Sequence, residues 1–534
     1  MIKQRLIIDY VKNGKLIKEV ALANNFVFRA YEIYGGKKFR KDEHLKNIIK
    51  VILTEGQELD QLQNGIEYNG VKYVQLITSP SMQKKEESAD SEDDEQEYKT
   101  EYLFINSAEK EFVSILEMIL SGDKIKTWED EKKKMCLVKD IVARMGLATS
   151  GTTKIDYVPN IVIVDEGSYS YKNNYTILEN GEFKEVDNFE REHVLNDGGG
   201  LMSNHMAEII AKEMNLDYRI DFAVIRQYKA LAVKGLVLRF DFADYMKNTY
   251  EKDTDYFRKR NGVYEIKDIF CCWRDIDKAD LILNKSMVKW IKNWTIEEGE
   301  DWQAIIDKEY SKKQYKAYLS ILNSLYVTKV NHDPKKLKTH TKVNYQVLQN
   351  CCCTSDDLTE MAQDTIKYYK KLASIDKENI DEIRISMGDI ASESGETTIT
   401  NKLDFLLKKM GEKALTLRSV ERAIAETVNK KIKQLAGGKM YLKGGYKLGA
   451  LDPTCYCNWL MTRERGNNGL CEHEFYIAGE IGNRVFYRNP IALYQEIKQI
   501  TLSDKLDIWL KDYTPELVFF NGFDDALFQA STAD

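Results

Sequence analysis

The 534-residue sequence predicts an α+β fold built from several domains. A chain of this length corresponds to about three or four domains at ~150 residues each. Hydrophobic residues make up 43% of the chain, which is enough for a large core. Strand-like segments gather toward the two ends, whereas helical apolar spacing dominates residues 245–435. We therefore expect strand-rich regions separated by a large helical insertion.

The first 126 residues are expected to form a mixed α/β region. Residues 6–10, 71–77 and 102–105 have strand character, and residues 110–125 have the apolar spacing of a helix. The charged, low-complexity segment 83–100 predicts a disordered loop. A strand that stops at this loop and resumes after it indicates a hairpin with a long tip.

Residues 127–195 are expected to lead into the centre of the chain through a helix at 127–150 and strands at 155–166. The polar segment 167–190 predicts a surface hairpin or loop. Residues 196–245 then contain a turn at Gly198, Gly199 and Gly200, a helix at 204–214, and strands at 221–227 and 231–240.

Residues 246–436 are expected to be a helical connector, with helices at 285–297, 299–323, 355–374, 376–391, 401–413 and 415–436. Residues 437–534 return to strands at 439–453, 475–479, 484–490 and 517–520, with a short helix at 492–499. We expect this last region to be a second strand-rich domain.

The charge distribution is compatible with nucleic acid as a partner. The net charge of -7 argues against it, but residues 86–97 carry eight acids and no base, so the remainder has -7 + 8 = +1. A nearly neutral remainder with local basic stretches can hold a basic channel. No apolar run approaches the ~20 residues that span a bilayer, so no membrane is expected. The odd number of bunched cysteines favours a reducing, cytoplasmic setting.

Seven short motifs occur in one order along the chain: Ser79–Lys84, Lys139–Ser150, Asp197–Ser203, Phe222–Tyr228 with Lys234–Val237, Lys285–Lys289, Lys447–Pro453 and Gly482–Pro490. Together they resemble the RNA-silencing type of RNA-dependent RNA polymerase and its single-chain phage RNA polymerase relatives. Asp-Gly-Gly-Gly-Leu-Met-Ser at 197–203 and the paired motif at 222–237 are the most specific of the seven.

The resemblance implies a fold of two double-psi β-barrels, with 196–245 in the first and 437–534 in the second. It implies templated RNA synthesis from ribonucleoside triphosphates on a nucleic acid template. In the family the first barrel supplies cations that hold phosphates. The second supplies an Asp-x-Asp-Gly-Asp loop for two Mg²⁺ ions, because hard Mg²⁺ takes carboxylate oxygens and two ions clamp the reacting groups.

The sequence departs from the family at this loop, because Asp-x-Asp-Gly-Asp occurs nowhere in it. Asp534 resembles the first aspartate of the loop, so the second barrel is expected to be incomplete in this chain. Asp534 is therefore the one expected catalytic Mg²⁺ ligand here, and a second polypeptide is expected to carry the others. A truncated gene product is the alternative explanation.

The resemblance also implies a set of nucleic-acid- and phosphate-binding residues: Arg226, Lys229, Lys234, Arg239, Lys289, Lys443, Lys447 and Arg488. The alternative is that these cations are solvated strand ends and surface groups. The three glycines predict a tight turn and resemble a phosphate cradle only weakly, since the lysine of a P-loop is lacking.

A zinc site is a weaker hypothesis. Cys455, Cys457, Cys471 and His473 have ligand types that zinc prefers, but the one-residue spacing of the first pair is tighter than usual. Unpaired thiols in a surface insertion are the favoured alternative, so zinc is not expected as a cofactor.

Two other functions compete with the double-barrel polymerase. One is a catalytically inactive nucleic-acid-binding protein derived from such a polymerase, which fits the missing aspartates. The other is a palm-type polymerase based on Asp241 and on Asp524 with Asp525, but their separation of 524 - 241 = 283 residues is too long for that pairing. We expect a bacterial protein, and a phage or a mobile element is one possible source of its gene. The sequence leaves open whether the template is DNA or RNA.

Overall fold

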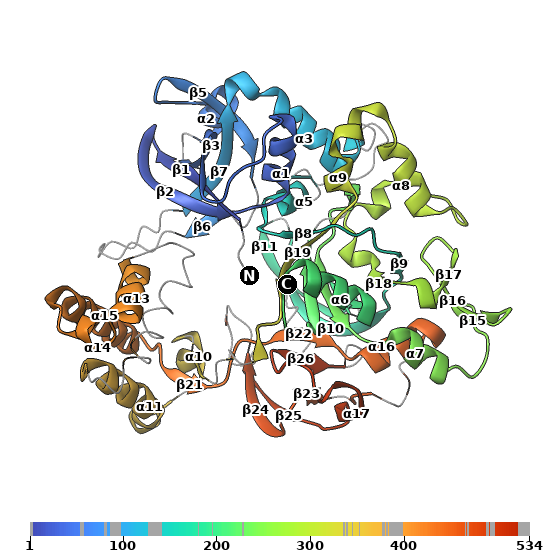
Figure 1. Cartoon of the computed structure of the whole chain (residues 1–534). Coiled ribbons are helices and arrows are strands. Elements are labelled where there is room, and N and C mark those ends of the chain that lie inside the picture. Colours follow the sequence, from blue (N-terminus) through green and yellow to red (C-terminus); the bar gives the residue numbers. More distant parts are fainter. Residues whose placement is uncertain are drawn as a thin grey trace. The chain divides into compact units, whose positions relative to one another are not determined.

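A computed structural model provides the structure of the chain (Figure 1). It describes residues 4–521 except 54–57, 79–82, 86–97, 126–140, 180, 195, 227–228, 335–336, 338–339, 344, 352, 376–379, 381–382, 384–398, 465, 467–468, 472, 488–490 and 492–496. The chain divides into two compact units. The first contains residues 1–331, 450–469 and 521–523, and the second contains residues 332–449, 470–520 and 524–534.

The first unit begins with an N-terminal sheet in the order β2-β1-β3-β7-β5-β4, with β6 paired to β7. Its strands are β1 Arg5–Lys12, β2 Lys15–Ala23, β3 Glu43–Leu53, β4 Ile66–Tyr68, β5 Val71–Ile77, β6 Gln83–Lys85 and β7 Tyr98–Asn106. Helices α1 Phe26–Tyr34 and α3 Glu111–Ser121 share a core with this sheet, whereas α2 Glu58–Asn64 buries no residue. Alternating residues on β3 and β7, together with Val11 of β1, face a second, smaller core, as expected for period-two strands.

The hairpin predicted around the acidic segment is confirmed, because β7 pairs with both β5 and β6. The loop boundaries 83–100 were too wide, since β6 and the start of β7 lie inside them. The acidic run 86–97 itself lies outside the described residues.

The second sheet of the first unit, called the barrel sheet below, has the order β8-β19-β13-β14-β12-β18-β9. Its strands are β8 Thr153–Ile155, β9 Ile161–Val164, β12 Gly199–Met202, β13 Phe222–Ile225, β14 Gly235–Arg239, β18 Leu281–Asn284 and β19 Leu325–Val330. The pairs β12–β14 and β9–β18 are parallel, and the other neighbours are antiparallel.

Chain connectivity requires this sheet to curl. The strands β8 and β9 form its opposite edges, although only residues 156–160 join them. Six residue steps from Ile155 to Ile161 reach at most about 22 Å. The edges of a flat seven-stranded sheet would lie about 29 Å apart, from six spacings of about 4.8 Å. The sheet is therefore bent toward a barrel, in agreement with the predicted fold class.

The barrel sheet draws its strands from several segments of the chain. Only β12, β13 and β14 come from 196–245, while 127–195 supplies β8 and β9 and the expected helical connector supplies β18 and β19. The strands β8, β9, β18 and β19 are short, which makes them hard to predict from sequence. In β18 the first three residues are all apolar, so this strand lacks the alternation of apolar and polar residues that indicates a strand.

The remaining elements of the first unit include a confirmed helix and a confirmed hairpin. Helix α6 Asn204–Glu213 begins after Ser203, whose Oγ accepts from the Met206 amide at 3.1 Å. The polar segment forms the hairpin β10 Ser168–Glu179 and β11 Glu182–Val194. The shorter elements are α5 Ala143–Met145, α7 Phe242–Asn248, and a small sheet of β15 Phe257–Arg260, β16 Val263–Lys267 and β17 Trp273–Asp275.

Two predicted helices are largely wrong. Residues 285–297 contain only the 3₁₀ turns Lys285–Met287 and Ile291–Asn293, and residues 299–323 split into α8 Trp302–Tyr310, a 3₁₀ segment Lys313–Tyr318 and α9 Leu319–Leu322. Trp290 and Trp302 are fully buried, so tertiary packing of large aromatic residues outweighs the helical spacing here.

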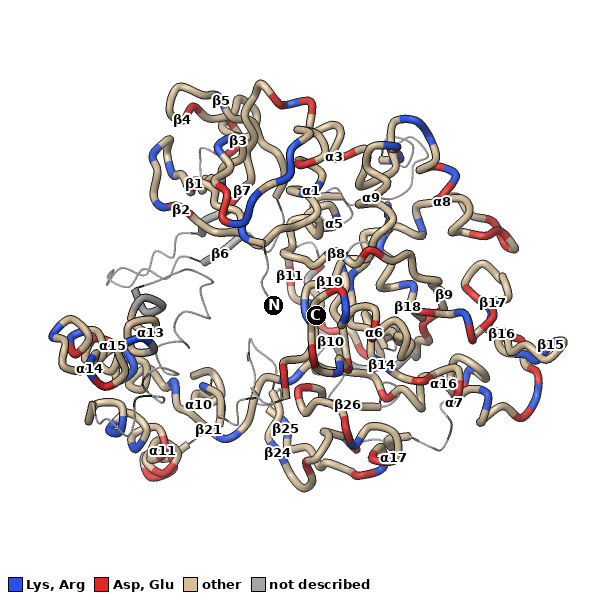
Figure 2. The backbone as a smooth tube through the Cα atoms, viewed as in Figure 1, with Lys and Arg blue, Asp and Glu red and all other residues tan. Residues whose placement is uncertain are grey.

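The second unit combines helices with a second curled sheet. Its helices are α10 Tyr345–Asn350, α11 Ser355–Ala373, α13 Ile399–Met410, α14 Glu412–Leu415, α15 Arg418–Ala436 and α17 Asp507–Leu510. Figure 2 shows charged residues of both signs on α11 and α15, as expected for helices with one solvated face. Along α11, Asp356 and Asp357 lie in the first turn and Lys370 and Lys371 in the last. The helices predicted at 355–374, 401–413 and 415–436 are confirmed, and most of 376–391 lies outside the described residues.

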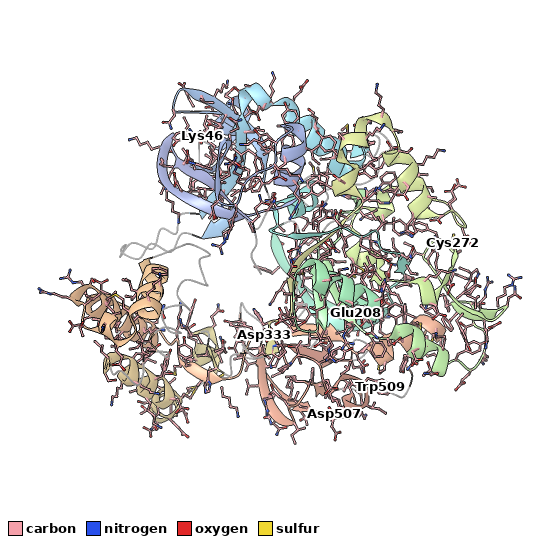
Figure 3. All side chains as sticks on the ribbon, viewed as in Figure 1. Lys46, Glu208, Cys272, Asp333, Asp507 and Trp509 are labelled. Atoms are coloured by element: carbon pink, nitrogen blue, oxygen red, sulfur yellow. The ribbon has the colours of Figure 1, made fainter. Side chains whose placement is uncertain are left out.

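The sheet of the second unit has the order β22-β26-β23-β25-β24. Its strands are β22 Leu448–Leu451, β23 Glu474–Tyr476, β24 Gly482–Tyr487, β25 Ile497–Leu502 and β26 Leu517–Phe520. A separate pair joins β20 His340–Lys342 to β21 Tyr441–Lys443. The short helix predicted at 492–499 is wrong at its end, because β25 begins at Ile497. Asp507 on α17 accepts from the Tyr476 hydroxyl at 2.8 Å, which ties α17 to this sheet (Figure 3).

Helix α16 Pro453–Thr462 belongs to the first unit, although in sequence it lies between the second unit's helices α15 and α17. Asp452 caps it, and Pro453 occupies its first turn, where no amide donor is needed. Among the described helices, none is both long enough and apolar enough to cross a lipid bilayer.

Candidate functional site

Five of the seven motifs contribute residues around the glycine run at the start of β12, and the contributing residues all lie in the first unit. The amide of Leu236 donates to the carbonyl of Gly198 at 2.9 Å, and that of Lys234 donates to the carbonyl of Met287 at 2.9 Å. Arg144 Nη1 donates to the carbonyl of Lys289 at 3.1 Å. Leu451, from the motif before α16, contacts the glycine run. Segments from five parts of the sequence therefore build one site.

The glycines are required by close backbone approach. Gly198 has a φ of +68°, and the Gly199 amide donates to the Asn196 carbonyl at 3.0 Å, which closes the predicted turn. A Cβ on Gly199 would lie 2.5 Å from Leu451 Cδ2, and one on Gly200 would lie 2.6 Å from the Ile282 carbonyl oxygen. The turn thus involves Gly198, whereas Gly199 and Gly200 already belong to β12.

Buried hydrogen bonds hold the turn in place. Asn284 is completely buried at the end of β18, and its Nδ2 donates to the Asn196 carbonyl at 2.7 Å. Its Oδ1 accepts from the hydroxyl of Tyr456 on α16. Burial raises the pKa of Tyr456 well above its usual value, so this phenol stays protonated and remains a donor.

A carboxyl group closes the other side of the turn. The Gly198 amide donates to Ser286 Oγ at 3.2 Å, and the Ser286 amide donates to Glu166 Oε2 at 3.1 Å. Burial raises the pKa of Glu166, and the hydrogen bonds from Ser286 oppose that rise. Its neighbour Asp165 forms an ion pair with Lys285.

Three cations, called the lysine cluster below, gather beside this turn: Arg144, Lys234 and Lys289. Burial lowers the pKa of Lys289, Asp197 and Glu166 oppose that change, and the charges of Arg144 and Lys234 add to it. Lys234 is exposed and Lys289 is half-buried. Among the described residues, neither lysine ammonium has a hydrogen bond or an ion pair with a side chain. Two ammonium groups are thus available for an anion.

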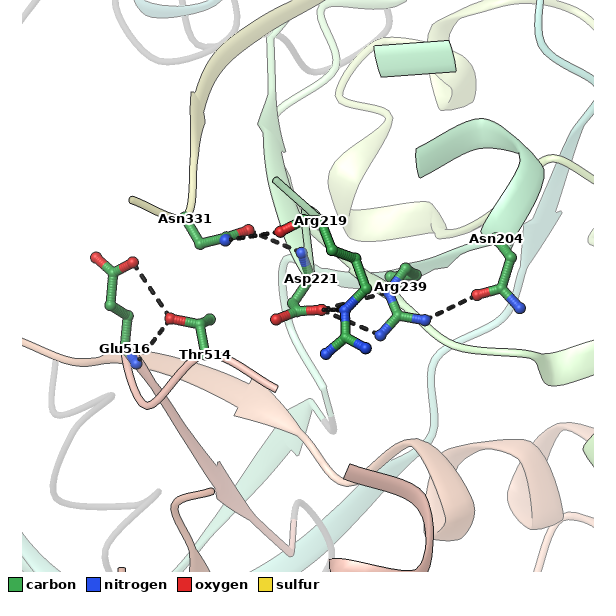
Figure 4. Close-up of polar contacts among 7 residues, drawn as sticks. All are labelled: Asn204, Arg219, Asp221, Arg239, Asn331, Thr514 and Glu516. Atoms are coloured by element: carbon green, nitrogen blue, oxygen red, sulfur yellow. Dashed lines mark hydrogen bonds and ion pairs between the residues drawn. The ribbon is translucent and has the colours of Figure 1, made fainter. Parts of the chain in front are cut away.

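The other cations predicted in the first unit already have partners. Lys229 is buried and forms an ion pair with Asp307. Arg239 contacts Asp221 at 3.0 Å and donates to Asn204 Oδ1 at 2.9 Å (Figure 4). Arg226 is half-buried, burial lowers its pKa, and its Nη1 donates to the adjacent Ile225 carbonyl at 3.0 Å. Of the predicted cations that the structure describes, Lys234 and Lys289 are therefore the two that lie beside this turn.

In the second unit, Lys447 contacts Glu480 at 3.1 Å and donates to the Pro515 carbonyl, whereas Lys443 is exposed on β21. Glu516, the residue after Pro515, is held by Thr514 at 3.3 Å (Figure 4). Arg488 and Asp534 lie outside the described residues, so their predicted roles have no structural account.

The four zinc candidates lie in different surroundings, and a zinc site there stays a sequence-based hypothesis. Cys455 and Cys457 are buried in α16, and burial raises the pKa of the Cys457 thiol well above its usual value. Cys471 and His473 are exposed, and Cys471 Sγ accepts from Lys505 at 3.1 Å. Among the described residues, the converging group of metal-ligand side chains is a different one, Asp9 with Glu19 and His44.

The structure adds no support to the palm-type hypothesis. Asp241 caps α7 by accepting from the Asp244 amide at 3.2 Å, and it accepts from Asn204 at 3.2 Å. These bonds give it a structural task at a helix N-terminus. Asp524 and Asp525 lie outside the described residues.

Sequence reasoning missed Arg144, Glu166, Asn284 and Tyr456. Arg144 lies within one of the seven motifs and Asn284 directly precedes another, so motif membership was the available signal. Glu166 and Tyr456 carry no local pattern, because their contacts join residues more than one hundred positions apart.

A family model and a solved structure are similar to this chain. A family model described as RNA dependent RNA polymerase matches residues 18–459. Among solved structures, the RNA dependent RNA polymerase QDE-1 from Thielavia terrestris is similar over 99% of this chain and 52% of its own, with 12% identity and a TM-score of 0.46. The chain thus spans about half the length of that polymerase. A search of curated proteins gives no match.

Proposed function

Because the chain belongs to the RNA-dependent RNA polymerase family, we propose that its lysine cluster binds the phosphates of an incoming ribonucleoside triphosphate during RNA-templated RNA synthesis. The observation that carries the proposal is the meeting of Arg144, Lys234 and Lys289 from three separate motifs, with two ammonium groups that have no side-chain partner among the described residues. The family supplies the reaction class, and the cluster supplies the chemistry expected of the first barrel.

Electrostatics support a phosphate ligand at this cluster. Each charge-assisted hydrogen bond contributes about 1.5–3 kcal/mol, and the preformed turn avoids the cost of ordering a loop. Half-burial of Lys289 strengthens its interaction with an anion, because the effective dielectric constant there is lower than in water. A triphosphate would also relieve the mutual repulsion of the three cations.

The described residues do not supply the Mg²⁺ site that the family implies. Glu166 is half-buried with a raised pKa and accepts from Ser286, and Asp197 and Glu166 are the acids whose charges oppose the lowered pKa of Lys289. Two such groups do not match a three-carboxylate loop. We therefore assign no reaction step to a metal ion at this cluster.

In this proposal another polypeptide segment carries the carboxylates for catalysis, since Asp-x-Asp-Gly-Asp does not occur in this sequence. A second polypeptide that carries them remains our hypothesis, and a continuation of the same polypeptide would serve equally. The family match favours an RNA template over the DNA template of the phage-like alternative. A bacterial or phage origin and a cytoplasmic location stay sequence-based hypotheses.

Nucleotide binding tests the proposal on the chain itself. We expect Lys234→Met and Lys289→Met each to weaken binding of a fluorescent ATP analogue by about 10–100-fold, the loss of one charge-assisted contact. The matched control is Lys46→Met, an exposed lysine on β3 (Figure 3), which should bind like the parent. Equal affinity in all four proteins would exclude the lysine cluster as the phosphate site.

RNA synthesis tests the reaction class. The chain, together with the polypeptide segment that carries the missing carboxylates, should extend RNA on a single-stranded RNA template with Mg²⁺, and Lys289→Met should lower that rate. Salt-dependent RNA binding with no synthesis under any of these conditions would instead support the inactive nucleic-acid-binding alternative.

A further inference from the structure

Three neighbouring strands of the N-terminal sheet bring Asp9, Glu19 and His44 together. Asp9 on β1 and Glu19 on β2 are directly opposite in the antiparallel register, and β3, which carries His44, flanks β1 on the other side. His44 Nε2 lies 2.7 Å from Asp9 Oδ1, and its Nδ1 lies 3.7 Å from Glu19 Oε1. Both ring nitrogens therefore face a carboxylate.

The two carboxylates lack the cation that such a pair needs. Like charges that face each other across two strands destabilise a sheet. Within the described parts of the chain, no lysine or arginine forms an ion pair with Asp9 or Glu19. Asp9 also acts on the tyrosines Tyr68 and Tyr73, which carry no positive charge. A bound cation would balance the two carboxylates.

We propose that Asp9, Glu19 and His44 form a binding site for a divalent transition-metal ion, with Zn²⁺ as the preferred ion. One nitrogen and two carboxylate oxygens suit Zn²⁺, whereas an imidazole ligand disfavours the hard ions Mg²⁺ and Ca²⁺. A water molecule would complete the four-coordinate shell. The ion would clamp β2, β1 and β3 and so stabilise the edge of the N-terminal sheet.

The geometry needs little adjustment to coordinate an ion. One ligand atom from each residue lies within 4.8 Å of the other two, and a tetrahedral zinc shell spaces its ligands about 3.4 Å apart. The side chains of Asp9 and His44 are 15% and 33% exposed, so they are held by the sheet, whereas Glu19 at 57% can move toward the ion. The Tyr68 hydroxyl donates to Asp9 Oδ2 at 3.2 Å, so it orients the carboxylate and leaves Oδ1 for the ion.

Spectroscopy on the whole chain distinguishes this site from the nine cysteines. After EDTA treatment, Co²⁺ at the site should give weak visible bands without thiolate-to-cobalt charge transfer, because its ligands are nitrogen and oxygen. We expect His44→Ala and Glu19→Gln to lose these bands and one equivalent of Zn²⁺ in calorimetry. Tyr68→Phe should keep the site and weaken it by about 10–100-fold.

His332→Ala is the matched control, because His332 Nδ1 lies 2.5 Å from Glu516 Oε1 and the residue is not part of this cluster. This variant should bind Zn²⁺ and Co²⁺ like the parent. Glu19 is exposed, so Glu19→Gln tests the site without risk to folding. Metal binding that is absent in the parent, or equal in the parent and the Glu19→Gln and His44→Ala variants, would overturn the proposal and leave a histidine–carboxylate ion pair only.

Discussion

Replacing Gly200 by alanine should open the barrel sheet where the candidate site is built. The added Cβ would lie 2.6 Å from the Ile282 carbonyl oxygen on β18, whereas ordinary contacts begin at 3.4 Å, so the two strands must separate by 3.4 - 2.6 = 0.8 Å. The Ile282 carbonyl oxygen belongs to the backbone, so it cannot move away by a change of rotamer as the end of a flexible side chain can. Overpacking of this kind costs about 1–3 kcal/mol, which raises the population of the locally open sheet by a factor of about 5–160.

Hydrogen–deuterium exchange is the appropriate assay, because a chain with two units need not unfold in a single two-state step. We expect faster amide exchange in β12 and β18 of Gly200→Ala and weaker nucleotide binding at the lysine cluster. Gly445→Ala is the control, since a Cβ at Gly445 meets no atom within 4 Å. If both variants exchange like the parent in β12 and β18, close backbone approach is not what requires glycine there.

Three further predictions concern groups around the turn. Tyr456→Phe should lower the free energy of unfolding of the first unit by about 1–3 kcal/mol in denaturant titrations, because it leaves the buried Asn284 Oδ1 without this donor. The control Tyr446→Phe changes a tyrosine that is 72% exposed and should have no effect. In fluorescence titrations, triphosphate affinity should fall as the pH rises toward the pKa of Lys289, which burial lowers below 10.5. Lys289→Arg should move this fall in affinity to higher pH, because the guanidinium stays charged. The same dependence of affinity on pH in both proteins would contradict the role of Lys289. The pKa of Glu166 is higher in the folded chain than in the unfolded chain, where it is about 4.3. Its contribution to the free energy of unfolding is therefore complete below a pH of about 4.3 and is lost as the pH rises through the pKa of the folded state. Thermal unfolding of Glu166→Gln should show a smaller loss of stability over this pH range than the parent.

Sequence patterns predicted the centre of the first unit well. Helix α6 and strands β13 and β14 match their predicted ranges, because each combines a regular apolar period with a clear start signal such as Ser203. The motifs also led to Lys234 and Lys289, the two residues that the structure places in the site. Local order and residue type were sufficient for these elements.

The rest depends on contacts that no local pattern encodes. Lys229 and Arg239 have the same residue types and similar positions as Lys234, yet distant acids at Asp307 and Asp221 bind them. The strands β8, β9, β18 and β19 are three to six residues long and become strands only through pairing with partners far along the chain. Selecting the available cations therefore required the tertiary structure.

The closure of the barrel sheet has a consequence for synthesis of the chain on the ribosome. The edge strand β8 has to wait for β19, which follows 325 - 155 = 170 residues later, and β9 has to wait for β18, which follows 281 - 161 = 120 residues later. At about 5–20 residues per second, the nascent chain exposes one unpaired edge for about 9–34 s. Exposed strand edges recruit other strands, so codons that speed translation between residues 161 and 330 should raise the yield of folded protein.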